Sequence, residues 1–120
     1  MTQHPDGPAI EFFKRGTVEM LPLDDGDHHS LYRDIAVVSK EGPLTAGIWQ
    51  LTGQGDYHYE FGYDECIWVF DGHVVIRDAD GVEYLGERGD LFIFRAPVSA
   101  TFLAGSDALL LCGSNSRIWL

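Results

Sequence analysis

Residues 53–72 read GQGDYHYEFGYDECIWVFDG, and this stretch decides the fold. Residues 57–61 are rich in aromatic side chains and follow two glycines, which predicts a short strand. A second apolar run, from Glu65 to Phe70, ends at Asp71-Gly72, a dipeptide typical of tight hairpin turns. We therefore expect a hairpin here, with the returning strand at residues 73–77.

The rest of the chain repeats this rhythm of short apolar runs and turn residues. Fourteen glycines and five prolines are spread over the whole length rather than gathered in a linker. No window of about eleven residues holds a helical period, because turn residues interrupt the chain roughly every ten positions. Further strands are expected at residues 35–39, 45–52, 82–85, 91–94, 101–103 and 108–112, with a second turn at 78–81. About nine to eleven strands without a substantial helix predict a β-sandwich or small barrel.

The composition is that of one globular domain: 120 residues, 45% hydrophobic and 22% charged. Nineteen acidic residues against eight basic ones give a formal net charge of -11. Because such a charge repels phosphate groups, we expect neither nucleic acid nor an anionic membrane as a partner. Residues 1–30 are the least patterned, and we expect them to form an N-terminal arm packed on the domain or on a partner. Residues 31–120 are expected to form the domain itself.

Several features of the sequence indicate the cellular compartment of the protein. No apolar run approaches the ~20 residues that cross a bilayer, and the N-terminus lacks the basic start and apolar core of a signal peptide. Cys66 and Cys112 both lie within apolar runs, so we expect buried, reduced thiols rather than a disulfide. These features predict a soluble cytoplasmic protein.

Residues 53–104 resemble the cupin family. The first motif of that family is G-x5-H-x-H-x3-4-E-x6-G, and the matching residues here are His58, Glu60, Glu65 and Gly72. Glu60 stands where the family has its second histidine, and the leading glycine comes one position late. The spacing that closes the motif at Gly72 matches without adjustment.

The second cupin motif, G-x5-P-x-G-x2-H-x3-N, is retained at its start, Gly89. Counting from that glycine places Ala100 at the metal-binding histidine and Ala104 at the asparagine. A Gly-Ile-Trp segment at residues 47–49 and Phe102 after the lost histidine resemble the small cupins similar to ureidoglycine aminohydrolase and to the ethanolamine-utilisation cupin. The resemblance implies an all-β double-stranded β-helix, the jelly-roll barrel of RmlC-like cupins, with a cavity at one end.

His58, Glu60 and Glu65 are the candidate metal ligands. His58 and Glu60 alternate on one strand and so share a face, and the resemblance implies that Glu65 points into the barrel. One imidazole and two carboxylates form a facial set of the kind that holds a divalent metal, here Mn(II), Fe(II), Ni(II) or Zn(II). Against a metal stands the fourth ligand, lost at Ala100. The alternative is a polar patch in which His58 is hydrogen-bonded to one of the two carboxylates.

Other residues are candidates for catalysis and for the substrate pocket. Glu60 and Glu65 are the candidate catalytic residues, because a pair of carboxylates suits general acid–base chemistry without metal. On the family's geometry, the pocket candidates are Tyr63, Arg95, Phe102 and Trp49. A guanidinium at Arg95 suits a substrate carboxylate, and its alternative is a surface salt bridge. For the aromatic residues the alternative is core packing.

Three hypotheses follow for the function. The first is a small metal-dependent or acid–base enzyme, a hydrolase, isomerase or oxygenase, acting on a polar metabolite. The second is a binding or accessory cupin that keeps the cavity without catalysis, since Ala100 and Ala104 replace both polar residues of the second motif. The third is a dimerisation domain, suggested by the aromatic residues and the apolar tail at residues 118–120. Small cupins resemble one another in pairing through sheet edges and N-terminal arms, so we expect a homodimer.

Overall fold

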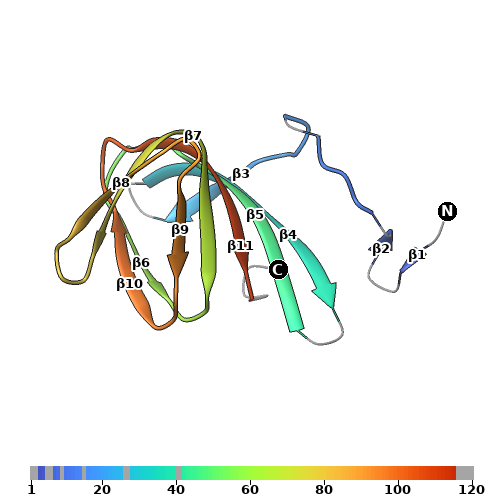
Figure 1. The fold of residues 1–120 in the computed structure, drawn as a ribbon. Coiled ribbons are helices and arrows are strands. Elements are labelled where there is room, and N and C mark those ends of the chain that lie inside the picture. Colours follow the sequence, from blue (N-terminus) through green and yellow to red (C-terminus); the bar gives the residue numbers. More distant parts are fainter. Residues whose placement is uncertain are drawn as a thin grey trace.

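Short strands follow the glycine and proline rhythm through the described part of the chain (Figure 1). The computed structural model describes residues 3–4, 7–8, 10–14, 16–25, 28–39 and 42–115. Its strands are β1 (Gln3–His4), β2 (Gly7–Pro8), β3 (Leu21–Asp25), β4 (His28–Ser39), β5 (Gly42–Leu51), β6 (Tyr57–Phe61), β7 (Glu65–Asp78), β8 (Glu83–Glu87), β9 (Leu91–Phe94), β10 (Val98–Phe102) and β11 (Asp107–Ser114). These ranges contain no helix, and so none that could span a membrane. The all-β prediction is confirmed.

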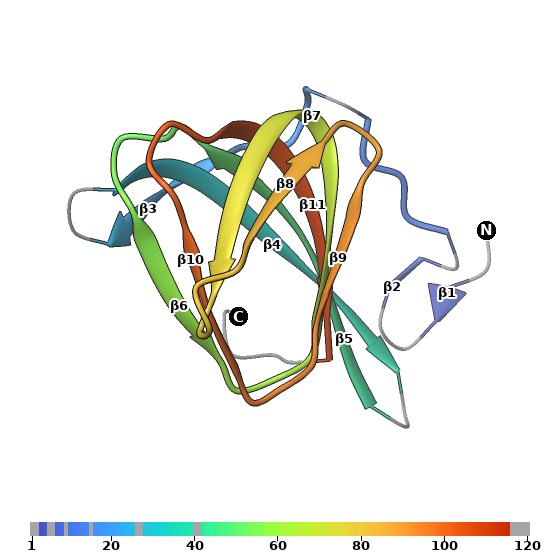
Figure 2. The same ribbon diagram turned by 60° about the vertical axis from the view of Figure 1, so that its left-hand side comes forward.

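One antiparallel sheet holds all but the first two strands. Its order is β3-β4-β5-β11-β7-β10-β6, and β8 and β9 also pair with β7. The first part of β7 pairs with β9 and β11, and its last part pairs with β8 and β10. Because β7 takes part in both groups, the sheet curls around a central space and forms the barrel seen in Figures 1 and 2.

The predicted hairpin at Asp71-Gly72 is wrong, because β7 runs unbroken through this dipeptide. Gly72 has a φ of 78°, and a Cβ at this position would collide with the carbonyl oxygen of Asp107 on β11. The register between β7 and β11 also shifts between Leu109 and Leu110. The glycine therefore allows a bend and a close approach of two backbones, where a tight turn was expected.

The second predicted turn, at residues 78–81, is confirmed and joins β7 to β8. The Asp78 carboxylate accepts hydrogen bonds from the backbone N–H groups of Asp80 and Val82, at 2.9 Å each. Gly81 supplies the left-handed backbone, with a φ of 85°. An aspartate that bonds the N–H two residues on is a common way to fix such a turn.

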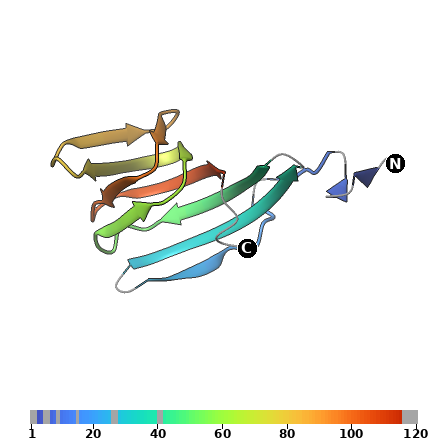
Figure 3. The same ribbon diagram turned by 90° about the horizontal axis from the view of Figure 1, so that it is seen from below.

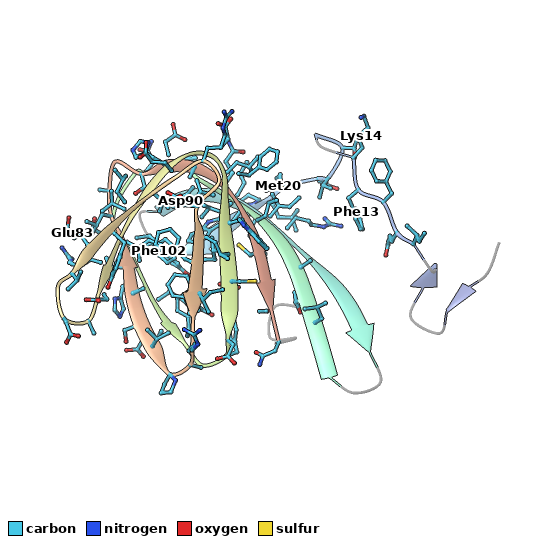
Figure 4. The ribbon with its side chains drawn as sticks, in the orientation of Figure 1. Phe13, Lys14, Met20, Glu83, Asp90 and Phe102 are labelled. Carbon is cyan, nitrogen blue, oxygen red and sulfur yellow. The ribbon has the colours of Figure 1, made fainter. Side chains whose placement is uncertain are left out.

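Aromatic rings from both sides of the barrel fill its centre. Phe102, on β10, is 1% exposed, and Figure 4 shows it inside the barrel. Its ring lies edge-on to Trp49 on β5, with the ring centroids 4.8 Å apart. Phe61 and Phe94 stack with their centroids 4.4 Å apart. Burial of each such side chain contributes about 1.5–3 kcal/mol, so these contacts hold the barrel wall in place.

The N-terminal segment divides into two parts. Residues 21–25 form β3, which pairs with β4 at the edge of the sheet, so the end of the predicted arm belongs to the barrel. Residues 10–14 lie outside it, with Phe12 80% exposed. Figure 3 shows this part of the chain extending past the end of the sheet. The apolar tail at residues 118–120 lies outside the described residues.

Candidate functional site

Strand β6 presents different side chains to the two faces of the barrel wall. Tyr57 and Phe61 are buried and Tyr59 is half-buried, whereas the side chains of His58 and Glu60 are 58% and 80% exposed. Successive residues of a strand point to opposite faces, so the three aromatic residues point inward. The inner face of β6 is aromatic and its outer face is ionisable.

His58 makes its contacts on the outer face. Its Nδ1 lies 3.0 Å from Oγ1 of Thr101 on the neighbouring strand β10, and its Nε2 lies 4.0 Å from Oε1 of Glu60. Beside them an open groove of about 550 Å³ is lined in part by Glu60, Asp78 and Asp80. An exposed pair at this distance contributes little to stability. The outer face is therefore a solvated polar surface.

Glu65 lies on the opposite side of the wall. It begins β7, where Ile67 and Val69 are fully buried and share its face. It stands opposite Phe94 on β9 and Ser114 on β11, and both of these are buried. Glu65 itself is half-buried. Its carboxylate thus belongs to the interior of the barrel.

The structure does not bring the three predicted metal ligands together. Two of them, His58 and Glu60, lie outside the barrel, and Glu65 lies inside. Among the described residues there is no group of three or more His, Cys, Asp or Glu side chains placed to hold a metal ion. The residues present do not fit the expected divalent metal, and Glu60 and Glu65 do not form a carboxylate pair. The described geometry therefore does not favour a metal site at His58, Glu60 and Glu65, and the assignment of these residues stays a prediction.

Polar side chains also lie on the inner side of the wall, near the end where β6 turns into β7. The hydroxyl groups of Tyr59 and Tyr63 are 2.8 Å apart, and both residues are half-buried. Thr45, Ser114 and Glu65 form one row across β5, β11 and β7, and Thr45 and Ser114 are buried. Tyr63 precedes Glu65 by two residues. We call these five residues the inner polar group.

Asp64 fastens the rim of this end. Its Oδ1 accepts a hydrogen bond from the N–H of Ala96, at 2.8 Å, in the turn between β9 and β10. Its own N–H donates to Oδ1 of Asn115 at 3.1 Å, and its carbonyl oxygen accepts from the N–H of Asn115 at 3.4 Å. Three segments distant in sequence are thereby joined beside Tyr63.

The predicted pocket residues fall into different environments. Tyr63 belongs to the inner polar group, and Trp49 is a half-buried wall residue lying edge-on to Tyr57, with ring centroids 5.6 Å apart. Phe102 is packed in the core. Arg95 is exposed just beyond β9 and forms no ion pair with any described residue, so its role toward a carboxylate stays a prediction.

Tyr57 and Tyr59 were not among the residues predicted for the pocket. The signal was present, because aromatic and ionisable residues alternate along residues 57–61. Aligning His58 with the motif histidine placed the predicted site on the outer face of β6. The neighbouring residues Tyr57 and Tyr59 are the ones that point inward. Ala100 does point inward and is 3% exposed, opposite Tyr59, so a methyl group occupies that part of the interior.

The family model of the EutQ-like cupin domain matches residues 38–104. The chain belongs to this family. The match supports the ethanolamine-utilisation side of the resemblance, whereas the link to ureidoglycine aminohydrolase stays a prediction. A search of curated proteins gave no match.

Solved structures give the same fold for this EutQ-like cupin. The EutQ protein of Clostridium difficile is 19% identical, with a TM-score of 0.72 over 85% of this chain and 83% of that one. A putative ethanolamine utilization protein Q from Salmonella typhimurium is 18% identical, with a TM-score of 0.74 over 88% and 85%. An RmlC-like cupin from Shewanella frigidimarina is 19% identical, with a TM-score of 0.63 over 90% and 94%. The predicted jelly-roll barrel is confirmed.

Proposed function

We propose that this EutQ-like cupin binds a small polar molecule bearing an ammonium group at the inner polar group. The observation that carries the proposal is the hydroxyl pair of Tyr59 and Tyr63 on the same inner surface as Glu65. Small-molecule sites combine apolar walls with a few convergent polar groups, and this end of the barrel has both. The hydroxyl groups could orient a ligand there, and the carboxylate could attract its ammonium group.

The charge of the site supports a cationic ligand over an anionic one. Glu65 is a carboxylate on an inner surface that also carries the rings of Trp49 and Tyr57. Aromatic faces attract organic cations, and the net charge of -11 draws cations toward the protein as a whole. A ligand with both an ammonium and a hydroxyl group could contact the carboxylate and the tyrosines together.

A binding role is favoured over a metal-dependent reaction, because the predicted ligands stand on two faces of the wall. A second candidate function is metal-free acid–base chemistry by Glu65, supported by its place on the same inner surface as two bonded phenols.

A cytoplasmic location and a homodimer also remain proposals. The location is supported by Cys66 and Cys112, neither of which forms a disulfide bond within the described residues.

A thermal-shift experiment tests the ligand class. The wild type is mixed in turn with ethanolamine, tetramethylammonium and acetate at neutral pH. We expect stabilisation by several degrees with the two cations at concentrations far above their Kd, more with ethanolamine than with tetramethylammonium, and none with acetate. Tyr59→Phe should reduce the ethanolamine shift and leave the tetramethylammonium shift unchanged.

The control is His58→Ala, which alters the adjacent residue on the outer face. It should keep both shifts. A shift with acetate alone would contradict the ligand class, and loss of the cation shifts in His58→Ala would contradict the location of the site. A catalytic role of Glu65 would be tested next, with whichever molecule binds.

A further inference from the structure

Two residues of the inner polar group, Ser114 and Glu65, are direct neighbours on adjacent strands. The register of β11 and β7 sets them opposite each other, and Thr45 on β5 stands on the other side of Ser114. Residues that lie opposite each other in an antiparallel pair have their Cβ atoms about 4.5–5.5 Å apart. One small group above this row can therefore contact Ser114 and Glu65 at the same time.

The hydroxyl group of Ser114 is buried without a partner. The residue is 6% exposed and shares the inward face of β11 with the fully buried Leu110. Within the part of the chain that the structure describes, this hydroxyl group forms no hydrogen bond. Buried polar side chains nearly always have a hydrogen-bond partner, so each exception needs an explanation. A bound molecule that donates a hydrogen bond to Ser114 supplies one.

Ser106 shows the contrasting case of a buried serine with a structural role. It is 1% exposed, and its Oγ accepts a hydrogen bond from the backbone N–H of Val75 at 3.0 Å. This contact joins the turn before β11 to β7. Ser106 precedes the first residue of β11 and Ser114 is the last residue of that strand, so the two serines lie at its opposite ends. A structural hydrogen bond accounts for Ser106 and does not account for Ser114.

The side chains around Ser114 and Glu65 differ on the two sides of the pair. The next inward row toward β5 holds Gly47 and Cys112, which are both small. On the other side Glu65 stands opposite Phe94 on β9, which is 6% exposed. A charged head group bound here would therefore meet a hydroxyl group on one side and an aromatic ring on the other. The ring can contact carbon, whereas the hydroxyl oxygen needs a hydrogen-bond donor.

We propose that Ser114 makes this site selective for primary ammonium groups over fully methylated ones. The inference rests on the proposed function, because it takes an ammonium ligand at the inner polar group as its starting point. A primary ammonium group carries three N–H donors, so one can bond the Glu65 carboxylate and another can bond Oγ of Ser114. A quaternary ammonium group has no N–H and leaves the Ser114 hydroxyl buried and unpaired.

The expected selectivity follows from the cost of that unpaired hydroxyl. A site that hydrogen-bonds an N–H or O–H group of its ligand discriminates strongly against an analogue that lacks the group. Ethanolamine and choline form a matched pair of probes, because they share the positive charge, the two-carbon chain and the hydroxyl group. Choline carries three methyl groups in place of the three N–H hydrogens. It keeps the attraction to Glu65 and to aromatic rings and loses only the bonds that the nitrogen donates.

The test is calorimetric titration of ethanolamine and of choline into the wild type, Ser114→Ala and Ser106→Ala. The wild type should bind ethanolamine roughly tenfold or more tightly than choline. Ser114→Ala should weaken ethanolamine binding by a similar factor without weakening choline binding, so that the preference is lost. Its melting temperature should stay near that of the wild type, because no hydrogen bond of the free protein is removed. Ser106→Ala is the matched control, and it should lower the melting temperature but keep the preference.

The possible failures of the two proposals are distinguishable. A preference for ethanolamine that survives in Ser114→Ala would overturn the assignment to Ser114, while ethanolamine binding itself would still support the proposed function. Equal binding of both amines by the wild type would overturn the selectivity. A wild type that binds neither amine would remove the proposed function and this inference together. Ser114→Cys keeps the shape of the side chain with a weaker acceptor, and it replaces Ser114→Ala if circular dichroism shows that the latter does not fold.

Discussion

The inner and outer faces of strand β6 differ by one residue in sequence and have opposite chemistry. Tyr57, Tyr59 and Phe61 join the aromatic interior, and His58 and Glu60 stand in solvent on the other side. The outer residues are those that a metal would prefer, yet the wall separates them from Glu65. The phase of a strand, meaning which of its alternate residues point inward, decides which side chains can act together. Residue types alone do not reveal that phase.

The largest expected loss of stability comes from a change in the barrel wall itself, at Gly72. Gly72→Ala puts a Cβ against the Asp107 carbonyl in a backbone conformation with φ of 78°, so we expect a loss of about 3 kcal/mol or more in the free energy of unfolding. Gly81→Ala is the control, because Gly81 also has positive φ but has open space around it, and about 1 kcal/mol should be lost. Urea denaturation measures both. Equal losses would show that the close approach at Gly72 is not important.

A matched pair of charges tests the two faces directly. Tyr59→Glu buries a carboxylate and removes the ring that lies 4.7 Å from Phe61, so it should cost about 2–4 kcal/mol. Glu60→Lys changes the next residue on the exposed face and should stay within about 0.5 kcal/mol of the wild type. Urea denaturation of the two variants in parallel checks this. Similar effects from both would mean that β6 does not have the assigned phase.

Removing single polar groups from the two faces of β6 should cause smaller losses of stability. Tyr59→Phe keeps the ring but loses the hydroxyl bond to Tyr63, which should cost about 1 kcal/mol. His58→Ala loses an exposed contact with Thr101 and should cost less. Differential scanning calorimetry resolves the two. A larger loss from His58→Ala would assign the structural hydrogen bond to the outer face.

The smallest effect concerns Tyr84, on β8. The Asp78 carboxylate accepts a hydrogen bond from its phenol at 3.2 Å and so raises its pKa above the usual value of about 10. The raised pKa means that the neutral phenol is favoured in the folded state. Its contribution is present below about pH 10 and is lost as the pH rises through the folded pKa. Ultraviolet titration of the wild type and of Asp78→Asn should show that one tyrosine titrates at a lower pH in the variant.

Local patterns predicted much of the fold and less of the site. Residues 57–61 and 91–94 were placed as the strands they form, because alternation and turn residues act within a few positions. The Asp71-Gly72 dipeptide was misassigned, since a tight turn and a bend both use a glycine of positive φ. Only the distant strand β11, through Asp107, makes this position a bend.

Motif spacing does not show which alternate residues of a strand point inward, so it could not locate the candidate site. Glu65, Tyr63 and Trp49 were anticipated as cavity or pocket residues, and the structure places them on the inner side. His58 and Glu60 were assigned to the same site from residue type, and their exposure comes from pairing with β10. The row of Thr45, Ser114 and Glu65 joins strands far apart in sequence, so no local pattern could have shown it.

Calorimetric titration of ethanolamine into Glu65→Gln and Glu60→Gln tests the central claim most directly. The two substitutions remove the same charge by the same chemical change, one inside the barrel and one outside. We predict that Glu65→Gln weakens binding at least tenfold relative to the wild type, and that Glu60→Gln leaves it unchanged. Weakening by Glu60→Gln with wild-type binding in Glu65→Gln would place the site on the outer face and contradict the account.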